Sequence, residues 1–256
     1  MNPEISIITP SYNSLDVFKS CLRSVYEQSF TNWELLIIDD CSPDSSYQSI
    51  LDFIKKNYPN DKRFRVFRNK QNLGPANTRN FGLRKAKGRF IAFLDVDDIW
   101  LPLKLETQLN FMKTKDIAFS YHSYLAYDQY LNEKLYSVKV PETLSYKEYI
   151  KNTCIGCLTV MLDTSKTGNI KMPNIKSSHD MALWLDILEI TEFAYGFNNH
   201  LARYRVLKSS NTAKKWKAAK DVWFVIRRYK THSLPASIYY FIHYAINAIK
   251  KRFNYE

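Results

Sequence analysis

Short apolar runs alternate with helix-like segments over the first hundred residues, and this alternation constrains the fold more than any other feature. Four runs are rich in β-branched and aromatic residues and are expected to be strands: Ile5–Thr9, Trp33–Ile38, Phe64–Arg68 and Arg89–Leu94, of which the second and fourth are expected to be buried. The segments between them carry apolar residues at helical spacing. Because parallel strands need a long crossover, usually a helix, this order predicts a doubly wound, mostly parallel α/β sheet.

The carboxyl ends of these expected strands carry acidic residues. The second and fourth runs are followed directly by Asp39, Asp40, Asp95, Asp97 and Asp98. In a parallel sheet such ends meet at one edge, where ligands bind. Clustered carboxylates repel one another and lose hydration, and a divalent cation relieves both costs. Hard oxygen ligands favour Mn²⁺ or Mg²⁺. An acidic turn that caps a helix near Trp100 is the structural alternative.

Four motifs at these positions carry a family resemblance. They are T-P-S-Y-N at 9–13, I-I-D-D-C-S-P-D at 37–44, N-L-G-P-A-N-T-R-N-F-G-L at 72–83 and F-L-D-V-D-D-I-W at 93–100. Together they resemble the N-terminal half of the family-two glycosyltransferases, which have the GT-A fold. The resemblance is strong over Ile5–Leu109 and weaker over His179–Leu188. It implies an α/β GT-A domain with a mostly parallel sheet.

The resemblance also implies roles for individual residues. Tyr12 would lie against the uracil of a UDP-sugar, Asp40 would bond the base or ribose, and Asp97 with Asp95 would engage the ribose, diphosphate and metal ion. The full set of residues that it implies for nucleotide-sugar binding is Pro10, Tyr12, Asp40, Arg79, Asp95, Val96, Asp97 and Arg205, with Asp97 and Asp95 as metal ligands. For Arg205, solvated charge on an alternating strand is the alternative.

Asp180 is the candidate catalytic residue. It precedes an apolar segment that predicts a helix, and Ser178 and Asp180 would serve as ordinary capping residues there. The resemblance implies instead that Asp180 is the general base of an inverting transfer. At the preceding position this chain has His179, where the family more often has Glu, so the charge beside the base differs.

The second half of the chain is less regular. Aromatic, alternating stretches at Asp116–Tyr127 and Tyr130–Val140 predict a hairpin or paired strands, and Cys154–Leu162 predicts another strand. The C-x-x-C formed by Cys154 and Cys157 is interpreted as small buried residues, because no further ligand pair accompanies it. We expect a catalytic domain at 1–212, with a nucleotide-sugar-binding half at 1–110 and an acceptor half at 111–212.

A basic, amphipathic helical tail is expected at 213–256. From residue 201 onward there are thirteen Lys or Arg and two acids, a local charge of +11 out of the chain's +12. The segment Ala236–Ile249 is apolar, too short to span a bilayer and followed by basic residues, which predicts association with an anionic membrane surface. A helix packed on the catalytic domain is the alternative. Nucleic acid is not expected, because the first 200 residues are nearly neutral and no binding motif is present.

The sequence thus predicts a metal-dependent, inverting hexosyltransferase. By the resemblance, the donor is a UDP-sugar carrying galactose or glucose, and the acceptor a polyprenyl-diphosphate-linked or lipopolysaccharide glycan. The start of the chain does not resemble a signal peptide, and four cysteines do not indicate a disulfide framework, so we expect a cytoplasmic, peripheral protein on the inner face of the cell membrane. The alternatives are a catalytically silent UDP-sugar-binding module and a sugar nucleotidyltransferase, whose glycine-rich, lysine-containing signature Pro10–Ser14 lacks.

Overall fold

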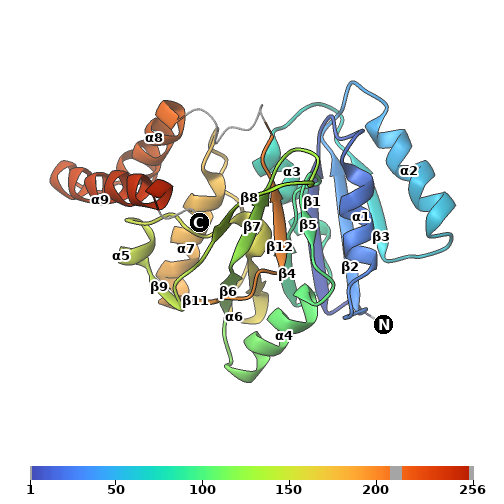
Figure 1. Ribbon diagram of the computed structural model, residues 1–256, viewed down its shortest axis with the longest axis horizontal. Helices are drawn as coiled ribbons and strands as arrows, with labels where there is room; N and C mark the ends of the chain where they lie inside the picture. The colour runs from blue at the N-terminus through green and yellow to red at the C-terminus, as the bar shows by residue number, and fades with distance from the viewer. Residues whose placement is uncertain (1, 208–214, 254–256) are drawn as a thin grey trace.

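The computed structural model describes residues 2–207 and 215–253 of the 256-residue chain (Figure 1). Its N-terminal half is the expected β-α-β alternation. The strands are β1 (Ile5–Ser11), β2 (Trp33–Asp39), β3 (Phe64–Arg68) and β4 (Phe90–Phe93), and the helices between them are α1 (Phe18–Tyr26), α2 (Ser46–Asn57) and α3 (Pro75–Lys85). These four strands are parallel, in the order β3-β2-β1-β4. The predicted parallel sheet is therefore confirmed.

The second half extends this sheet and adds a smaller one. The large sheet continues after β4 with β10 (Met161–Asp163), β6 (Phe119–His122), β11 (Phe193–Phe197) and β9 (Thr143–Ser145). The small sheet has the order β5 (Ile99–Trp100), β12 (Ala202–Arg205), β7 (Tyr124–Tyr127) and β8 (Lys134–Val138). The remaining helices of this half are α4 (Lys104–Thr114), α5 (Tyr146–Tyr149), α6 (Thr164–Thr167) and α7 (His179–Thr191).

Of three local predictions of secondary structure, one is confirmed and two are wrong. The hairpin is confirmed for β7 and β8, which pair antiparallel, whereas β6 joins the large sheet instead. The helix near Trp100 is wrong, because Ile99–Trp100 forms β5 and α4 begins only at Lys104. The strand at Cys154–Leu162 is also wrong. There, hydrogen bonds are local: the Thr159 hydroxyl donates to the Gly156 carbonyl at 2.7 Å, and a 3-10 turn, η1, spans Cys157–Thr159 before β10.

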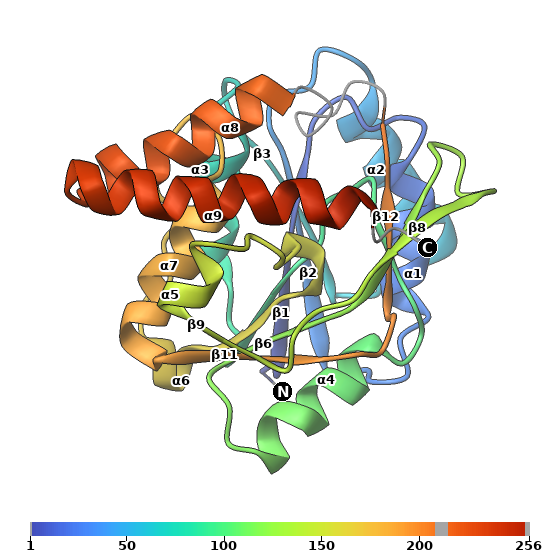
Figure 2. The same ribbon diagram turned by 60° about the vertical axis from the view of Figure 1, so that its left-hand side comes forward.

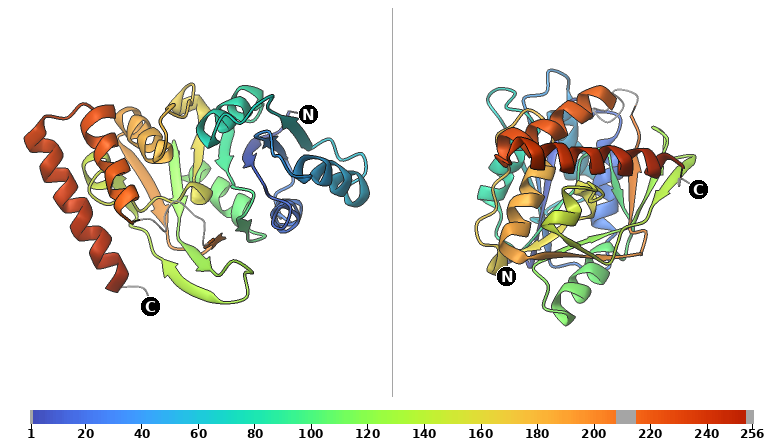
Figure 3. Two further views of the ribbon diagram at one scale, coloured as in Figure 1. Left: turned by 90° about the horizontal axis from the view of Figure 1, so that it is seen from above. Right: turned by 90° about the vertical axis from the view of Figure 1, so that its left-hand side faces the viewer.

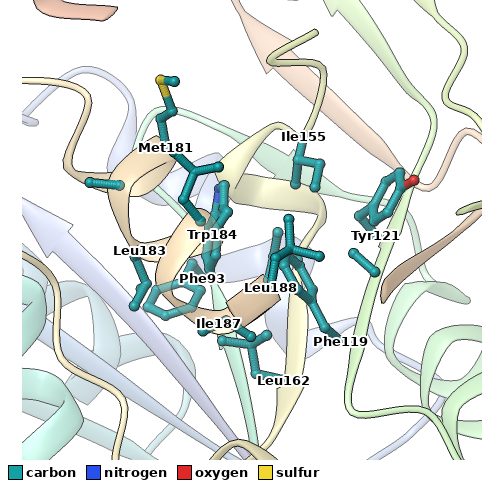
Figure 4. Close-up of a cluster of buried hydrophobic side chains, with 14 of the residues drawn as sticks. Phe93, Phe119, Tyr121, Ile155, Leu162, Met181, Leu183, Trp184, Ile187 and Leu188 are labelled. Carbon is teal, nitrogen blue, oxygen red and sulfur yellow. The ribbon is translucent and has the colours of Figure 1, made fainter. Parts of the chain in front are cut away.

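Two apolar clusters, one on each face of the large sheet, hold the domain together. Successive residues of β1 point to opposite faces, so Ile7 lies in one cluster and Ile8 in the other. On the face covered by α7, the Trp184 ring lies 5.6 Å from that of Phe93 and 5.4 Å from that of Phe119 (Figure 4). Burial of such rings supplies most of the stabilisation and fixes the start of α7 against the sheet.

The C-terminal region packs on the same face. It consists of α8 (Lys215–Phe224), a π-helical turn η3 (Val225–Tyr229) and α9 (Leu234–Phe253). Val222, Val225 and Ile226 are buried in the cluster that contains Trp184. The three views show α8 and α9 beside α7 and α5, at the end of the molecule opposite α2 (Figures 2 and 3). Within the described residues, no helix is long and apolar enough to cross a membrane.

Candidate active site

The site forms where β1, β2 and β4 end. The Asp40 amide donates to the Ser11 carbonyl at 2.8 Å, and the Leu94 amide donates to the Ile8 carbonyl at 3.1 Å, so the loops that follow the three strands emerge side by side. Pro10 belongs to β1, and Tyr12 follows it with 48% of its surface exposed. The expectation that these strand ends share one edge of the sheet is confirmed.

Asp40 is buried and holds the loop that leads into α3. Its Oδ1 accepts hydrogen bonds from Asn69 Nδ2 at 2.8 Å and from the Leu73 amide at 2.9 Å, and its Oδ2 accepts from the Gly74 amide at 2.8 Å. Gly74 has φ +79°, a backbone conformation that residues other than glycine rarely adopt. Asp40 thereby fixes the backbone turn before Pro75, and the loop lines a hollow of about 360 Å³.

Asp95, Asp97 and Asp98 form the acidic cluster that the sequence predicts. Each offers a carboxylate oxygen, and these atoms lie within 4.8 Å of one another. Burial, and then the charge of Asp95, raises the pKa of Asp97 to about 6, and burial followed by the charge of Asp97 raises the pKa of Asp98 well above its ordinary value. Both pKa values are raised first by burial and then by the neighbouring carboxylates, against the lowering effect of Arg205. A divalent cation would supply compensating charge, and the all-oxygen donor set fits Mn²⁺ or Mg²⁺.

Arg205 of β12 braces this cluster. Its amide donates to Asp98 Oδ1 at 2.9 Å, and its Nε donates to the Asp97 carbonyl at 2.7 Å. Its terminal nitrogens donate to the Gln129 carbonyl at 2.7 Å and to Ser20 Oγ at 3.1 Å. The Arg205 guanidinium is thus bound by protein acceptors from three segments. Asp98 belongs to the acidic run noted in the sequence but is not among the binding or metal-ligating residues predicted there.

Arg79 of α3 is buried and joins two parts of the site. One terminal nitrogen forms an ion pair with Asp95 Oδ1, and the other lies 2.8 Å from His179 Nε2. Burial alone would lower the pKa of Arg79, but the neighbouring Asp95 holds it above the ordinary value, so the group stays cationic. Burial lowers the pKa of His179, and Arg79 adds to that effect against the charge of Asp180. No motif in the sequence indicates the contact between Arg79 and His179.

Asp180 lies in the first turn of α7. Its Oδ1 accepts from the Met181 amide at 2.9 Å. The prediction that Ser178 caps the helix with its side chain is wrong: Ser178 has φ 55° and makes no side-chain capping bond. A left-handed residue directly before the helix turns the chain sharply, and Asp180 is placed on the wall of a cleft.

This cleft encloses about 470 Å³ and brings Arg79, Asp95 and Asp180 together. Of the other assigned residues, Asp97 belongs to the adjoining acidic cluster, Val96 lies between two of its members, and Arg205 binds it. Pro10, Tyr12 and Asp40 lie at the strand ends, outside the residues that line this cleft. The rest of the lining comes largely from the loop that begins α7, from the segment after α5 and from α8. Sequence reasoning missed the contribution of α8, because no local pattern reports a tertiary contact.

The segment after α5 contains the C-x-x-C. Cys154 and Cys157 are free thiols, and Cys157 faces the cleft. Burial raises the pKa of the Cys157 thiol well above its ordinary value, so it stays protonated and unreactive at neutral pH. Its role as a small, compact wall residue agrees with the interpretation from the sequence.

Known proteins with similar sequences were found over nearly the whole chain. A protein of Bacillus subtilis named as a teichuronic acid biosynthesis glycosyltransferase, TuaG, is 43% identical over 252 residues, covering 98% of each chain. The Escherichia coli protein WfgD, named UDP-Glc:α-D-GlcNAc-diphosphoundecaprenol β-1,3-glucosyltransferase, is 37% identical, covering 98% of this chain and 96% of its own.

Solved structures show the same fold. The S. aureus TarS fragment 1–349 in complex with UDP-GlcNAc superposes with a TM-score of 0.70 at 22% identity, covering 88% of this chain and 64% of that one. The chain therefore matches about two thirds of that fragment's length. A mannosyltransferase of Pyrobaculum calidifontis, solved with GDP-Man and Mn²⁺, superposes with a TM-score of 0.69 at 13% identity, covering 100% of this chain and 77% of its own. The expected GT-A fold is confirmed.

The model of the family described as glycosyl transferase family 2 matches residues 6–165, which span β1 to α6 and include the acidic cluster and Arg79. The strand-end motifs, the GT-A fold and the relatives that align end to end therefore agree. The chain belongs to glycosyl transferase family 2.

Proposed function

We propose that this glycosyltransferase transfers a hexose, glucose or galactose, from a UDP-sugar to a saccharide linked to a polyprenyl diphosphate, with inversion at the anomeric carbon. The observation that carries the proposal is the shared cleft: the Asp180 carboxylate lines the same hollow as the Arg79–Asp95 pair. A base and a charged diphosphate site are the two things that such a transfer requires. The relative WfgD, whose name specifies a UDP-glucose donor and a GlcNAc-diphosphoundecaprenol acceptor, supports these substrate classes.

Asp180 acts as the general base. It takes the proton from the acceptor hydroxyl while that oxygen attacks the anomeric carbon, and UDP leaves from the opposite face. Holding acceptor and donor in one cleft lowers the entropic part of the barrier. His179 lies next to Asp180 in the chain with its pKa lowered by burial, so it adds no positive charge that would weaken the base at neutral pH.

The donor half is 1–110. Tyr12 and Pro10 provide the surface against which the uracil lies, and Val96 accompanies Asp95 and Asp97 at the ribose and diphosphate. Asp40 contacts the nucleoside with the remaining hydrogen-bonding capacity of its carboxylate and holds the Leu73–Gly74 turn in place. Arg79 and Arg205 supply positive charge near the diphosphate.

Asp97 and Asp95 would hold a metal ion, Mn²⁺ or Mg²⁺, and the Asp98 carboxylate lies beside them. When bound, the ion acts as a Lewis acid on the diphosphate leaving group. The chain's own contribution is to gather three carboxylates and to hold their positions: Arg205 binds the Asp98 carboxylate and the Asp97 main-chain carbonyl, and Arg79 binds the Asp95 carboxylate. The ligands are thereby positioned before substrate arrives.

The protein acts at the cytoplasmic surface of the cell membrane, held there by α9. One side of this helix rests on α5, where Lys151 Nζ donates to the Tyr239 hydroxyl at 3.0 Å and Asn247 Nδ2 donates to the Lys151 carbonyl at 3.0 Å. The other side exposes an aliphatic stripe, defined as Leu234, Ile238, Ile242, Ile246 and Ile249. Between 222 and 253 the sequence contains no acid, so the stripe is accompanied only by positive charge and suits anionic lipid.

The test is a donor and acceptor screen with the purified full-length chain. We expect Mn²⁺- or Mg²⁺-dependent transfer from UDP-glucose or UDP-galactose to a GlcNAc-diphospho-lipid, with the product linkage inverted relative to the donor by NMR. Binding of UDP-sugar without any transfer or hydrolysis, across a panel of donors and acceptors, would identify a silent binding module. Release of a sugar phosphate with formation of nucleoside triphosphate would identify a nucleotidyltransferase.

A further inference from the structure

We propose that α8 forms the acceptor-binding wall of the cleft, and that the Asp221 carboxylate binds hydroxyl groups of the acceptor saccharide. This inference rests on the proposed function, because it names the part of the cleft that receives the acceptor. It assigns a substrate contact to a segment of the chain that follows all the family motifs.

The position of Asp221 on α8 makes it part of the cleft. Ala218, Asp221 and Val222 all line the cleft that contains Asp180. Their spacing of three and four residues places them on one face of the helix. Lys220 of the same helix is exposed and is not among the residues that line the cleft. A single helical face is therefore presented to the base.

The wall is fixed relative to Asp180. Immediately after Asp221, Val222, Val225 and Ile226 are buried in the cluster shared with α7. Polar contacts tie the same segment to α7: the Tyr229 hydroxyl donates to Asp186 Oδ2 at 2.6 Å, and Lys230 pairs with Asp186 and Glu189. Because Asp180 begins α7, the helix that carries the base also anchors the wall, and the distance between the two carboxylates is set by packing.

The chemistry of this wall suits a saccharide. Among residues 2–207 and 215–253, no hydrogen bond or ion pair to the Asp221 carboxylate is found, although the residue is half-buried. An ionised carboxylate accepts hydrogen bonds only, so hydroxyl groups are matching partners, whereas the phosphates of the donor would be repelled. The same cleft offers apolar surface from Ile155, Val222 and Tyr149 for the face of a sugar ring. The Asp221 carboxylate therefore fits the hydroxyl groups of a saccharide and not the diphosphate of either substrate, and its place on the cleft wall beyond the donor motifs assigns it to the acceptor saccharide.

The test compares Asp221→Ala and Asp221→Asn with Lys220→Ala, a matched control on the exposed side of the same helix. Loss of a hydrogen bond to a charged group costs about 1.5–3 kcal/mol, so Asp221→Ala should raise the acceptor KM roughly 10- to 100-fold. The KM for UDP-sugar and its slow hydrolysis without acceptor should stay within about 2-fold of the parent, since the donor residues are untouched. Asp221→Asn, which keeps the shape and one acceptor oxygen, should give a smaller rise.

Each outcome decides between the two claims. An acceptor KM for Asp221→Ala within about 2-fold of the parent, in a folded protein that transfers sugar, overturns the acceptor wall and leaves the proposed function standing. If the parent chain itself transfers nothing, the proposed function fails. In that case, calorimetric titration of the GlcNAc-diphospho-lipid head group into the parent chain and into Asp221→Ala decides about the wall. Equal binding, or none to either, rejects it.

Discussion

Arg79 donates a hydrogen bond to Nε2 of His179 across 2.8 Å, while its second terminal nitrogen pairs with Asp95. An arginine guanidinium has no acceptor and keeps its protons, so Nε2 must be the unprotonated ring nitrogen and the imidazole hydrogen lies on Nδ1. The lowered pKa of His179, caused first by burial, agrees with a neutral ring. The residue beside the base is thus a neutral hydrogen-bond acceptor that joins α7 to the donor side of the cleft.

This relationship predicts how substitutions of His179 rank. His179→Leu removes one of the two partners of the buried Arg79 and should raise the KM for UDP-sugar by about 10-fold or more, because a hydrogen bond from a charged group contributes about 1.5–3 kcal/mol. His179→Gln can still accept from Arg79 and should stay within about 3-fold of the parent. Steady-state kinetics at saturating acceptor measure both. Equal effects of the two substitutions would show that the hydrogen bond is not what matters.

The acidic cluster predicts the effect of removing one ligand. Asp97→Ala should abolish the dependence of UDP binding on Mn²⁺ and reduce transfer by at least about 100-fold, because the ion loses a ligand and the diphosphate loses its Lewis acid. The fold should persist, since removal of Asp97 relieves repulsion with Asp95 and Asp98. Calorimetric titration of UDP with and without Mn²⁺ is the measurement. Metal-dependent affinity that survives in Asp97→Ala would move the metal site elsewhere.

The exposed stripe of α9 predicts binding to anionic vesicles. Ile242→Asp together with Ile246→Asp should abolish sedimentation with phosphatidylglycerol vesicles. Each change removes exposed apolar area that the lipid would bury, and adds a negative charge that anionic lipid repels. Transfer to a short, soluble acceptor should be retained. Ile190→Asp, at an even more exposed isoleucine on α7, is the control and should bind as the parent does. Unchanged binding of the double variant would contradict a membrane role for this face.

The buried His122 predicts a pH dependence of stability. Burial, and then the nearby Lys104, lowers its pKa to about 3. The unfolded chain takes up this proton near pH 6.5, but the folded chain does not until about pH 3. The free energy of unfolding is therefore unaffected by His122 above pH 6.5, and it falls as the pH drops from 6.5 towards 3.

Urea unfolding between pH 6.5 and 4.5 measures this effect. In His122→Phe the free energy of unfolding should fall less steeply with decreasing pH than in the parent. The two slopes should differ by up to about 1.4 kcal/mol per pH unit. His243→Gln, on the half-buried side of α9, is the control and should follow the parent. Parallel slopes for His122→Phe and the parent would show that His122 titrates alike in both states.

The sequence predicted what is encoded locally. The strands β2 and β4 could be predicted because strands buried on both faces are nearly continuous apolar runs, and each of these two is followed by acids. The acidic cluster and the position of Asp180 before a helix followed from the same local patterns. The order of strands β3-β2-β1-β4 was not needed to expect the cluster, since all parallel strands end at one edge.

The rest depends on contacts between distant segments. The segment Cys154–Leu162 has strand-like composition, but turn hydrogen bonds such as that from Thr159 to Gly156 replace a ladder. Arg79 and His179 lie one hundred residues apart, so no local spacing reveals their bond. The tail reads as one basic, amphipathic region, yet Val225 and Ile226 are buried in the core while Ile242 stays exposed. The boundary expected at 212 lies outside the described residues.

The most direct test of the account is the substitution Asp180→Asn, which keeps the shape of the side chain and removes its ability to take a proton. We predict that the transfer rate at saturating substrates falls by a factor of about 100 to 10,000, the range for loss of a general base. The Kd for UDP-sugar and the thermal midpoint should remain within about 2-fold and about 2 °C of the parent, respectively. A variant that transfers sugar at the parental rate per folded molecule would contradict the assignment of Asp180 as the base.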